Sequence, residues 1–285
     1  MKNIFVLSLS LLSVSVFAQQ KVLTQAIITT KTSIIVPEGQ DDQNVPPPPP
    51  GGPGEEVRVM RFGGEGDTKS ITTMKGDLIK TYTETDMGRT TIIRDNKNKK
   101  TTTLLEMMGT KNGFYASDEE QEQMRKQMDS MMQSRRQSGD QARTFTPPTY
   151  DILYTADTKK IAGYNCKKAY VVATRKNGKK DSSEVWYTPD FKIQGLSSTG
   201  GAGGGIVSVF MRNAGLGGLD KIDGFPMKYE TTMGRGRKMI VEVQKIVTDK
   251  DIADKEFDVP KDFTLKPMKE MQNAFGRGNF QIRHD

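Results

Sequence analysis

The chain has 285 residues and a formal net charge of +7, with a single Cys, a single Trp and a single His. One cysteine excludes an intramolecular disulfide, and a chain of this length can bury enough core to fold without one. The basic residues are spread over many short turns, so we interpret them as solvated hairpin tips and expect no nucleic-acid partner.

Residues 1–18 have the pattern of a secretory signal peptide. Lys2 gives a positive start, Ile4 to Phe17 is apolar apart from small hydroxyl residues, and Val16 and Ala18 suit the −3 and −1 positions of a cleavage site. The apolar run is shorter than the roughly 20 residues that a bilayer span requires. We therefore predict an exported protein, periplasmic or envelope-associated, with no transmembrane segment in its mature chain.

Residues 19–285 are expected to form one β-rich domain. Lys21 to Val36 is rich in Ile, Val and Thr and predicts the first strand. A Pro/Gly-rich insertion follows at residues 37–55, with five consecutive prolines at Pro46 to Pro50. Proline supplies no amide donor, so this insertion is an exposed loop with polyproline II character. It is either a simple insertion or a ligand for the aromatic groove of a partner.

The chain from Glu56 to Gly113 predicts a β-meander, because short β-prone runs alternate with turn formers at roughly ten-residue spacing. The strands are rich in Thr and Lys, so at least one face of the antiparallel sheet should be wet. The expected strands are Val57 to Phe62, Thr68 to Met74, Asp77 to Thr83, Arg89 to Arg94 and Thr101 to Met107.

Ser117 to Gln137 changes to a helical period. Ser117 and Glu120 form a capping box, in which the hydroxyl and the carboxylate accept from each other's backbone amides. A methionine stripe follows at i, i+4, i+7 and i+8. The helix either covers part of the sheet or acts as a lid over an apolar cavity, since thioethers adapt to varied acyl or peptide surfaces. The stripe consists of Met124, Met128, Met131 and Met132.

Tyr150 to Asp190 contains the clearest hairpin. Asn177-Gly178 lies between two β-prone runs, Lys168 to Thr174 and Glu184 to Thr188, which predicts neighbouring antiparallel strands joined by a type I′ turn. Cys166 lies in a period-2 pattern and is expected to be a small buried apolar residue.

The last third of the chain begins with a Gly-rich loop at residues 195–218, which matches neither the P-loop nor the dinucleotide-binding glycine pattern. Two further strands are expected at Phe225 to Glu230 and Lys238 to Val247, joined around Gly234 to Gly236.

Several segments together resemble an uncharacterised exported domain family common in Bacteroidetes, grouped with the LolA-like lipoprotein-carrier fold. A sister family named for a G-L-P-G-L-I motif shares the first two segments, but G-F-P-M stands in place of that motif here, which favours the first family. The resemblance implies a mainly β protein with a few helices: an open antiparallel half-barrel covered by helices. The segments are D-T-K-K-I-A-G-Y-N-C-K-K-A (Asp157 to Ala169), V-W-Y-T-P-D (Val185 to Asp190), G-F-P-M-K-Y-E (Gly224 to Glu230) and F-D-V-P-K-D-F (Phe257 to Phe263).

Two non-enzymatic functions follow from these features. The first is a binding module for a hydrophobic or acyl ligand, such as a lipid or a lipoprotein acyl chain, with the ligand supported by fold analogy alone. The second is an envelope protein-interaction module with a filled core and no small ligand. The residues predicted to line a cavity are Met124, Met128, Met131 and Trp186.

An enzyme is the least supported class. His284, the only histidine, lies one residue from the end of the chain, and neither a thiol–base pair nor a metal-ligand cluster is apparent in the sequence. No pair of carboxylates stands out from ordinary surface charges. We predict no catalytic residue, no metal site and no cofactor.

Overall fold

The molecule is described from a computed structural model. Four predicted segments lie outside the described residues: the signal peptide, the strand at 57–62, the Pro/Gly-rich insertion and the Gly-rich loop. Pro37 of the insertion and Gly218 of the loop are described. The described residues are 20–37, 66–85, 88–107, 109–137, 148–193, 218–233 and 236–270.

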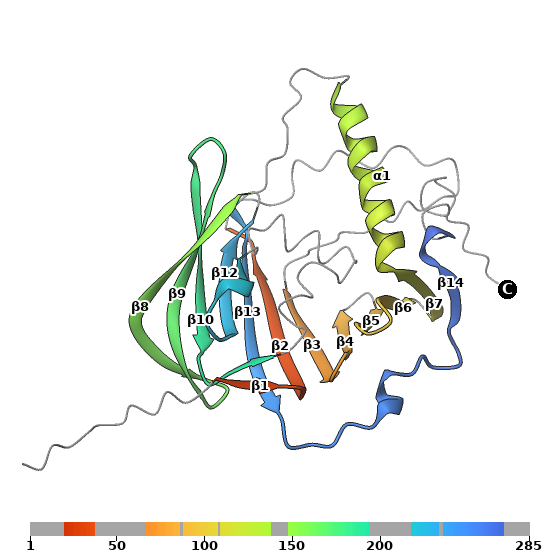
Figure 1. Cartoon of the computed structure of the whole chain (residues 1–285), viewed down its shortest axis with the longest axis horizontal. Helices are drawn as coiled ribbons and strands as arrows, with labels where there is room; N and C mark the ends of the chain where they lie inside the picture. Colours follow the sequence, from red (N-terminus) through yellow and green to blue (C-terminus); the bar gives the residue numbers. More distant parts are fainter. Residues whose placement is uncertain are drawn as a thin grey trace, which may run out of the picture.

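The fold is mainly β: an open, mostly antiparallel twelve-stranded sheet and a two-stranded sheet that pairs β1 with β11 (Figure 1). Among the described strands, β8 and β14 are the two edges of the large sheet, so it is not closed into a barrel. The order across the large sheet is β14-β7-β6-β5-β4-β3-β2-β13-β12-β10-β9-β8. The strands are β1 (Lys21–Leu23), β2 (Gln25–Ile35), β3 (Gly66–Lys75), β4 (Leu78–Thr85), β5 (Gly88–Asp95), β6 (Lys100–Met107), β7 (Thr110–Ser117), β8 (Thr149–Ile161), β9 (Tyr164–Thr174), β10 (Lys180–Thr188), β11 (Phe191–Ile193), β12 (Phe225–Thr232), β13 (Lys238–Val247) and β14 (Thr264–Pro267).

The meander is confirmed over β3 to β6, and two strands of the sheet were not predicted. β7 pairs with β6, and β8 forms one edge of the sheet. The single strand expected at Lys21 to Val36 is wrong, since the chain divides at Thr24 into β1 and β2. The Thr24 carbonyl accepts a hydrogen bond from the Gly76 amide at 2.7 Å, so this residue leaves the ladder of β2 to close the neighbouring turn.

The expectation of a purely antiparallel sheet is also wrong. β14 pairs in parallel with β7, and β1 pairs in parallel with β11. Parallel pairing requires a long connection between the two strands. It is available in both cases, because the partners are separated by much of the chain.

The hairpin between β9 and β10 is confirmed, but its turn is not type I′. Among the described non-glycine residues only Lys99 and Ala162 have positive φ, so Asn177 does not. Gly178 has φ 77° and its amide donates to the Arg175 carbonyl at 2.8 Å, which fits a type I turn closed by a left-handed glycine. Positive φ at two successive turn residues occurs instead at Ala162 and Gly163, which join β8 to β9.

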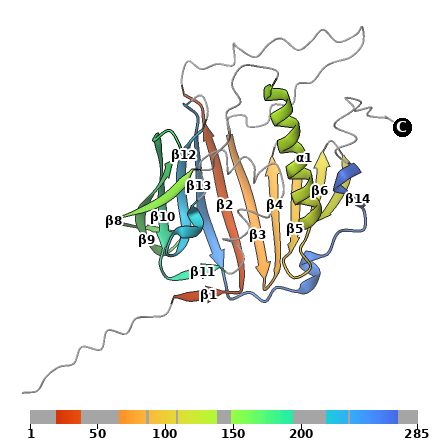
Figure 2. The same ribbon diagram turned by 45° about the horizontal axis from the view of Figure 1, so that its top comes forward.

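Alternation along the strands gives the large sheet two distinct faces. We call inner the face that carries Met74, Ile79 and Arg94, and outer the face that carries their strand neighbours Lys75 and Lys80. Helix α1 (Asp118–Gln137) begins on the inner side. Figures 1 and 2 show α1 rising beside β5 to β7, on the side of the sheet opposite to the chain that links β13 to β14.

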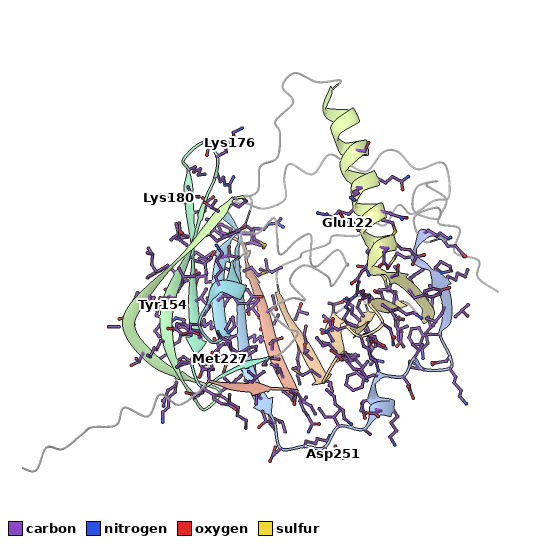
Figure 3. The ribbon with its side chains drawn as sticks, viewed as in Figure 1. Glu122, Tyr154, Lys176, Lys180, Met227 and Asp251 are labelled. Atoms are coloured by element: carbon purple, nitrogen blue, oxygen red, sulfur yellow. The ribbon has the colours of Figure 1, made fainter. Side chains whose placement is uncertain are left out.

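The outer segment, residues 249–263, crosses the outer face before β14. Its Ile252 and Phe257 are buried against Ile93 and Leu104. In Figure 3, Asp251 of this segment and Glu122 of α1 lie on opposite sides of the sheet. Lysines of the outer face hold the segment: Lys75 donates to the Ile252 carbonyl at 2.7 Å and to Asp254 at 2.8 Å, Lys80 to the Glu256 carbonyl at 2.6 Å, and Lys111 to Asp262 at 2.5 Å.

Candidate functional site

The inner face of the sheet is the candidate functional site, because its chemistry differs from that of an ordinary solvated face. On β2 to β7 the lysines and nearly all other charged residues point outward, as the strand registers require. Of the inner-facing residues of these strands that the structure describes, only Arg94 is charged. Lys, Glu and Arg normally cover wet sheet faces, so an uncharged face that is still partly exposed calls for another explanation.

Hydroxyl groups recur on the inner face of β2 to β6, in register with apolar side chains such as Ile92 and Leu105, and we call the hydroxyl set the hydroxyl array. Ser70 and Thr83 are hydrogen-bonded at 3.0 Å, and Thr72 and Thr81 at 3.2 Å. Neighbouring members are spaced by about 4.8 Å across strands and roughly 6.8 Å along them. All members are half-buried, so they are neither sealed in a core nor fully solvated. The array consists of Thr30, Thr32, Thr68, Ser70, Thr72, Thr81, Thr83, Thr90 and Thr103.

The other half of the inner face, on β9 to β13, is apolar and already packed. Val185 and Tyr229 are buried there against Ile222, which follows the short 3-10 helix η1 (Leu219–Lys221). Lys221 donates to the Tyr150 carbonyl at 2.7 Å, and the Asp223 amide donates to the Tyr154 hydroxyl at 3.1 Å. This part of the inner face is therefore filled by residues 219–223.

A buried ion pair fixes the start of α1 at the inner face. Arg94 is 4% exposed, and its two terminal nitrogens both bond the Asp118 carboxylate, one of them at 2.8 Å. Its Nη1 also donates to the Thr101 hydroxyl at 3.1 Å. The hydrogen bonds from Arg94 hold the pKa of Asp118 below its ordinary value. The one inner-facing charge on β2 to β7 is therefore neutralised by α1.

The predicted capping box is present at the same point. The Ser117 amide donates to the Glu120 carboxylate at 2.8 Å, and the Glu120 amide donates to the Ser117 hydroxyl at 3.1 Å. These bonds satisfy amides that the first turn of a helix leaves free. The predicted helix at Ser117 to Gln137 is confirmed.

The predicted cavity-lining residues do not all come together. Met124 is half-buried on α1, while the side chains of Met128 and Met131 lie outside the described residues. Trp186 lies on β10 and points to the outer face, because its neighbours Val185 and Tyr187 pack in the inner cluster. Met124 and Trp186 therefore lie on opposite sides of the sheet, and a cavity lined by the methionine stripe stays a prediction.

Trp186 belongs to a charged ladder on the outer face of β8 to β10. Its indole nitrogen donates to Glu184 at 2.7 Å, and the Lys159 amino group lies 4.1 Å from the centre of one of its rings. Lys168 bridges to Glu184 at 3.1 Å. Such stacked and paired contacts stabilise neighbouring strands. They give Trp186 a structural role in the sheet.

Trp186 is also the only tryptophan, so its fluorescence reports on Lys159. Burial, followed by the nearby charge of Lys228, lowers the pKa of Lys159 below its ordinary value of 10.5. Lys168 has its pKa raised, chiefly by Tyr170 and Glu184, and keeps its charge in that range. Deprotonation of Lys159 removes the cation from the ring.

We expect a step in Trp186 emission as pH rises through the lowered pKa of Lys159, below 10.5. The step should be absent in Lys159→Met, which keeps the aliphatic stem over the ring, and present in the matched variant Lys160→Met on the same strand. An unchanged titration in Lys159→Met would assign the step to another group.

Cys166 is buried, as predicted, and burial raises the pKa of its thiol, which disfavours the reactive thiolate.

Among the described residues, no group of three or more His, Cys, Asp or Glu is arranged to hold a metal ion. Within the same residues, no helix has the length and apolar character needed to cross a membrane.

Comparisons with known proteins give partial matches. A family model described as "N-glycanase peptide, N-terminal domain" matches residues 119–217, which run from α1 through β8 to β11 and beyond. No curated protein matches the chain.

Three solved structures are similar in outline. PNGF-II in two crystal forms is 15% and 16% identical, with TM-scores of 0.38 and 0.36, and covers 89% of this chain. The third structure is the MucA/MucB complex of Pseudomonas aeruginosa. One chain of it is 11% identical over 83% of this chain, with a TM-score of 0.34. The present chain spans only 33% and 34% of the PNGF-II chains and 56% of the third chain.

Proposed function

We propose that this chain is an exported, non-enzymatic binding module whose inner sheet face takes an uncharged ligand. The single observation that carries the proposal is the segregation of charge. Lysines and carboxylates lie on the outer face of β2 to β7, whereas the inner face is uncharged apart from the neutralised Arg94. On these strands a charged ligand would find no unpaired counter-ion, while an uncharged one loses little solvation energy.

Other features support the same proposal. The open sheet with α1 rising beside its inner face is compatible with the LolA-like half-barrel that the resemblance implies. The predicted signal peptide at residues 1–18 supports export to the periplasm or envelope.

A hydrophobic or acyl ligand remains the second candidate, and the helix favours it. Met124, Met128 and Met131 recur at helical spacing along α1, whose first turn is fixed at the inner face. An acyl chain would then contact this stripe instead of the hydroxyl array. The packed half of the inner face also keeps open the alternative of a protein-interaction module with no small ligand.

Native mass spectrometry of the mature protein purified from its own envelope tests the proposal. We expect a stoichiometric adduct. Extraction into water would release a neutral polar molecule, and extraction into organic solvent would release an acyl compound. A protein that is empty and takes up neither neutral polar molecules nor acyl compounds would contradict the proposal and direct the search to protein partners and the proline-rich loop.

A further inference from the structure

We infer that the hydroxyl array is a binding site for a neutral oligosaccharide chain. The inference rests on the proposed function, because it names the ligand of the same inner face. The observations behind it are the geometry and hydrogen-bonding capacity of the array and the lack of charged side chains, apart from the paired Arg94, on the inner face of β2 to β7.

Each hydroxyl of the array can donate one hydrogen bond and accept others. Hydrogen bonds within the array use part of this capacity: Ser70 bonds Thr83, and Thr72 bonds Thr81. Among the residues that the structure describes, each pair therefore keeps one hydroxyl donor and further lone pairs available. A matching ligand must offer donors and acceptors at short, regular intervals, as the hydroxyls of a sugar chain do.

The rows of the array run across several strands. One row joins Thr30, Ser70, Thr83 and Thr90 in register. Four strands at about 4.8 Å spacing extend roughly 14 Å, and this length suits a ligand of several residues better than a single small molecule. The threonine methyl groups between the hydroxyls can contact the C–H faces of sugar rings.

Other ligand classes fit the array less well. An acyl chain laid on it would remove water from hydroxyls outside the Ser70–Thr83 and Thr72–Thr81 pairs without replacing their hydrogen bonds, at a cost of about 1–3 kcal/mol each. An anionic ligand would need a cation, but Arg94 binds Asp118, and on α1 Arg125 and Lys126 pair with Glu122. An uncharged extended peptide has donors and acceptors too, so it is the competing occupant that the experiment must separate.

The test measures binding of three neutral hexasaccharides by calorimetry: β-1,4-linked glucose, β-1,4-linked N-acetylglucosamine and α-1,6-linked mannose. The key variant is the double substitution Thr72→Val/Thr81→Val. It removes both partners of one hydrogen bond with isosteric side chains, so stability should change little. We expect binding of at least one hexasaccharide, weakened roughly tenfold in this variant.

The matched control is Thr29→Val/Thr91→Val, which removes two half-buried hydroxyls from the outer face of β2 and β5. It should bind as the parent protein does. Equal weakening in both double variants would overturn the assignment to the array. Binding of an uncharged Ser/Asn/Gly hexapeptide but of no hexasaccharide would overturn the ligand class.

Failure of this inference can be distinguished from failure of the proposed function. If the envelope-purified protein carries an acyl compound and no hexasaccharide binds, the binding module stands and the oligosaccharide inference falls. If no neutral molecule or acyl probe binds at all, both fall.

Discussion

Asp118→Ala is expected to destabilise the protein by about 2–3 kcal/mol at neutral pH. Arg94 is almost fully buried, and removing its partner leaves a guanidinium without a counter-ion. Breaking a buried ion pair usually costs about 3–5 kcal/mol. The Asp118 side chain is 33% exposed, so solvent screening reduces that figure. Urea unfolding measures the loss.

The control is Glu122→Ala on the same helix. Glu122 pairs with Arg125 on the exposed surface, and such pairs contribute little. We expect no measurable change in its unfolding midpoint. The double variant Arg94→Met/Asp118→Ala should recover much of the stability, because the buried charge is gone. If Asp118→Ala and Glu122→Ala behave alike, the pair does not anchor α1.

The same ion pair gives stability a defined pH dependence. Because the pKa of Asp118 is lower in the folded protein than its ordinary value of 3.8, folding favours the ionised carboxylate. The contribution is complete above the unfolded pKa and is lost as pH falls through the folded one. The stability difference between the parent protein and Asp118→Ala should therefore shrink below about pH 4.

Gly224→Ala is expected to destabilise the protein by about 3 kcal/mol or more. Gly224 has φ 157°, and a Cβ there would lie 2.2 Å from the backbone oxygen of Thr188 and 2.7 Å from the Tyr187 ring. Backbone cannot retreat as a flexible side chain can, and overpacking alone costs about 1–3 kcal/mol. The change would force β12 away from β10 at the point where their register already shifts.

The control is Gly163→Ala, in the turn between β8 and β9. Gly163 also has positive φ, at 88°, but nothing lies within 4 Å of a Cβ there. This variant should lose only about 1–2 kcal/mol from backbone strain. Thermal and urea unfolding of both variants separate close contact from backbone strain. Equal losses of stability in the two variants would mean that the close contacts at Gly224 add nothing to the backbone strain.

Local chemistry was readable from the sequence where neighbouring residues decide the structure. The Ser117–Glu120 capping box determined where α1 begins, since both partners lie within one turn. The turn formers of the meander placed β3 to β6 correctly. The hairpin at Asn177-Gly178 was also correct, although its turn type was not, because the turn from Arg175 to Gly178 closes with a single left-handed glycine.

Long-range pairing was not readable from the sequence. β2 lies between β3 and β13, although nearly the whole chain separates it from β13. β14 reaches β7 only after the outer segment has crossed the sheet. β7 and β8 were missed although β8 contains Tyr150, Ile152 and Tyr154, because charged and small residues interrupt the β-prone runs and the partner strands supply the hydrogen bonds.

The candidate site shows the same division most clearly. The sequence by itself determined that the strands are rich in Thr and Lys and that residues 117–137 form a helix with methionines at helical spacing. Only the tertiary structure decided that the members of the hydroxyl array share the inner face and the lysines of β2 to β7 the outer one, and that Trp186 points away from α1. The physical reason is that side chains alternate along a strand, so which set faces inward depends on the pairing register and on what packs against each face.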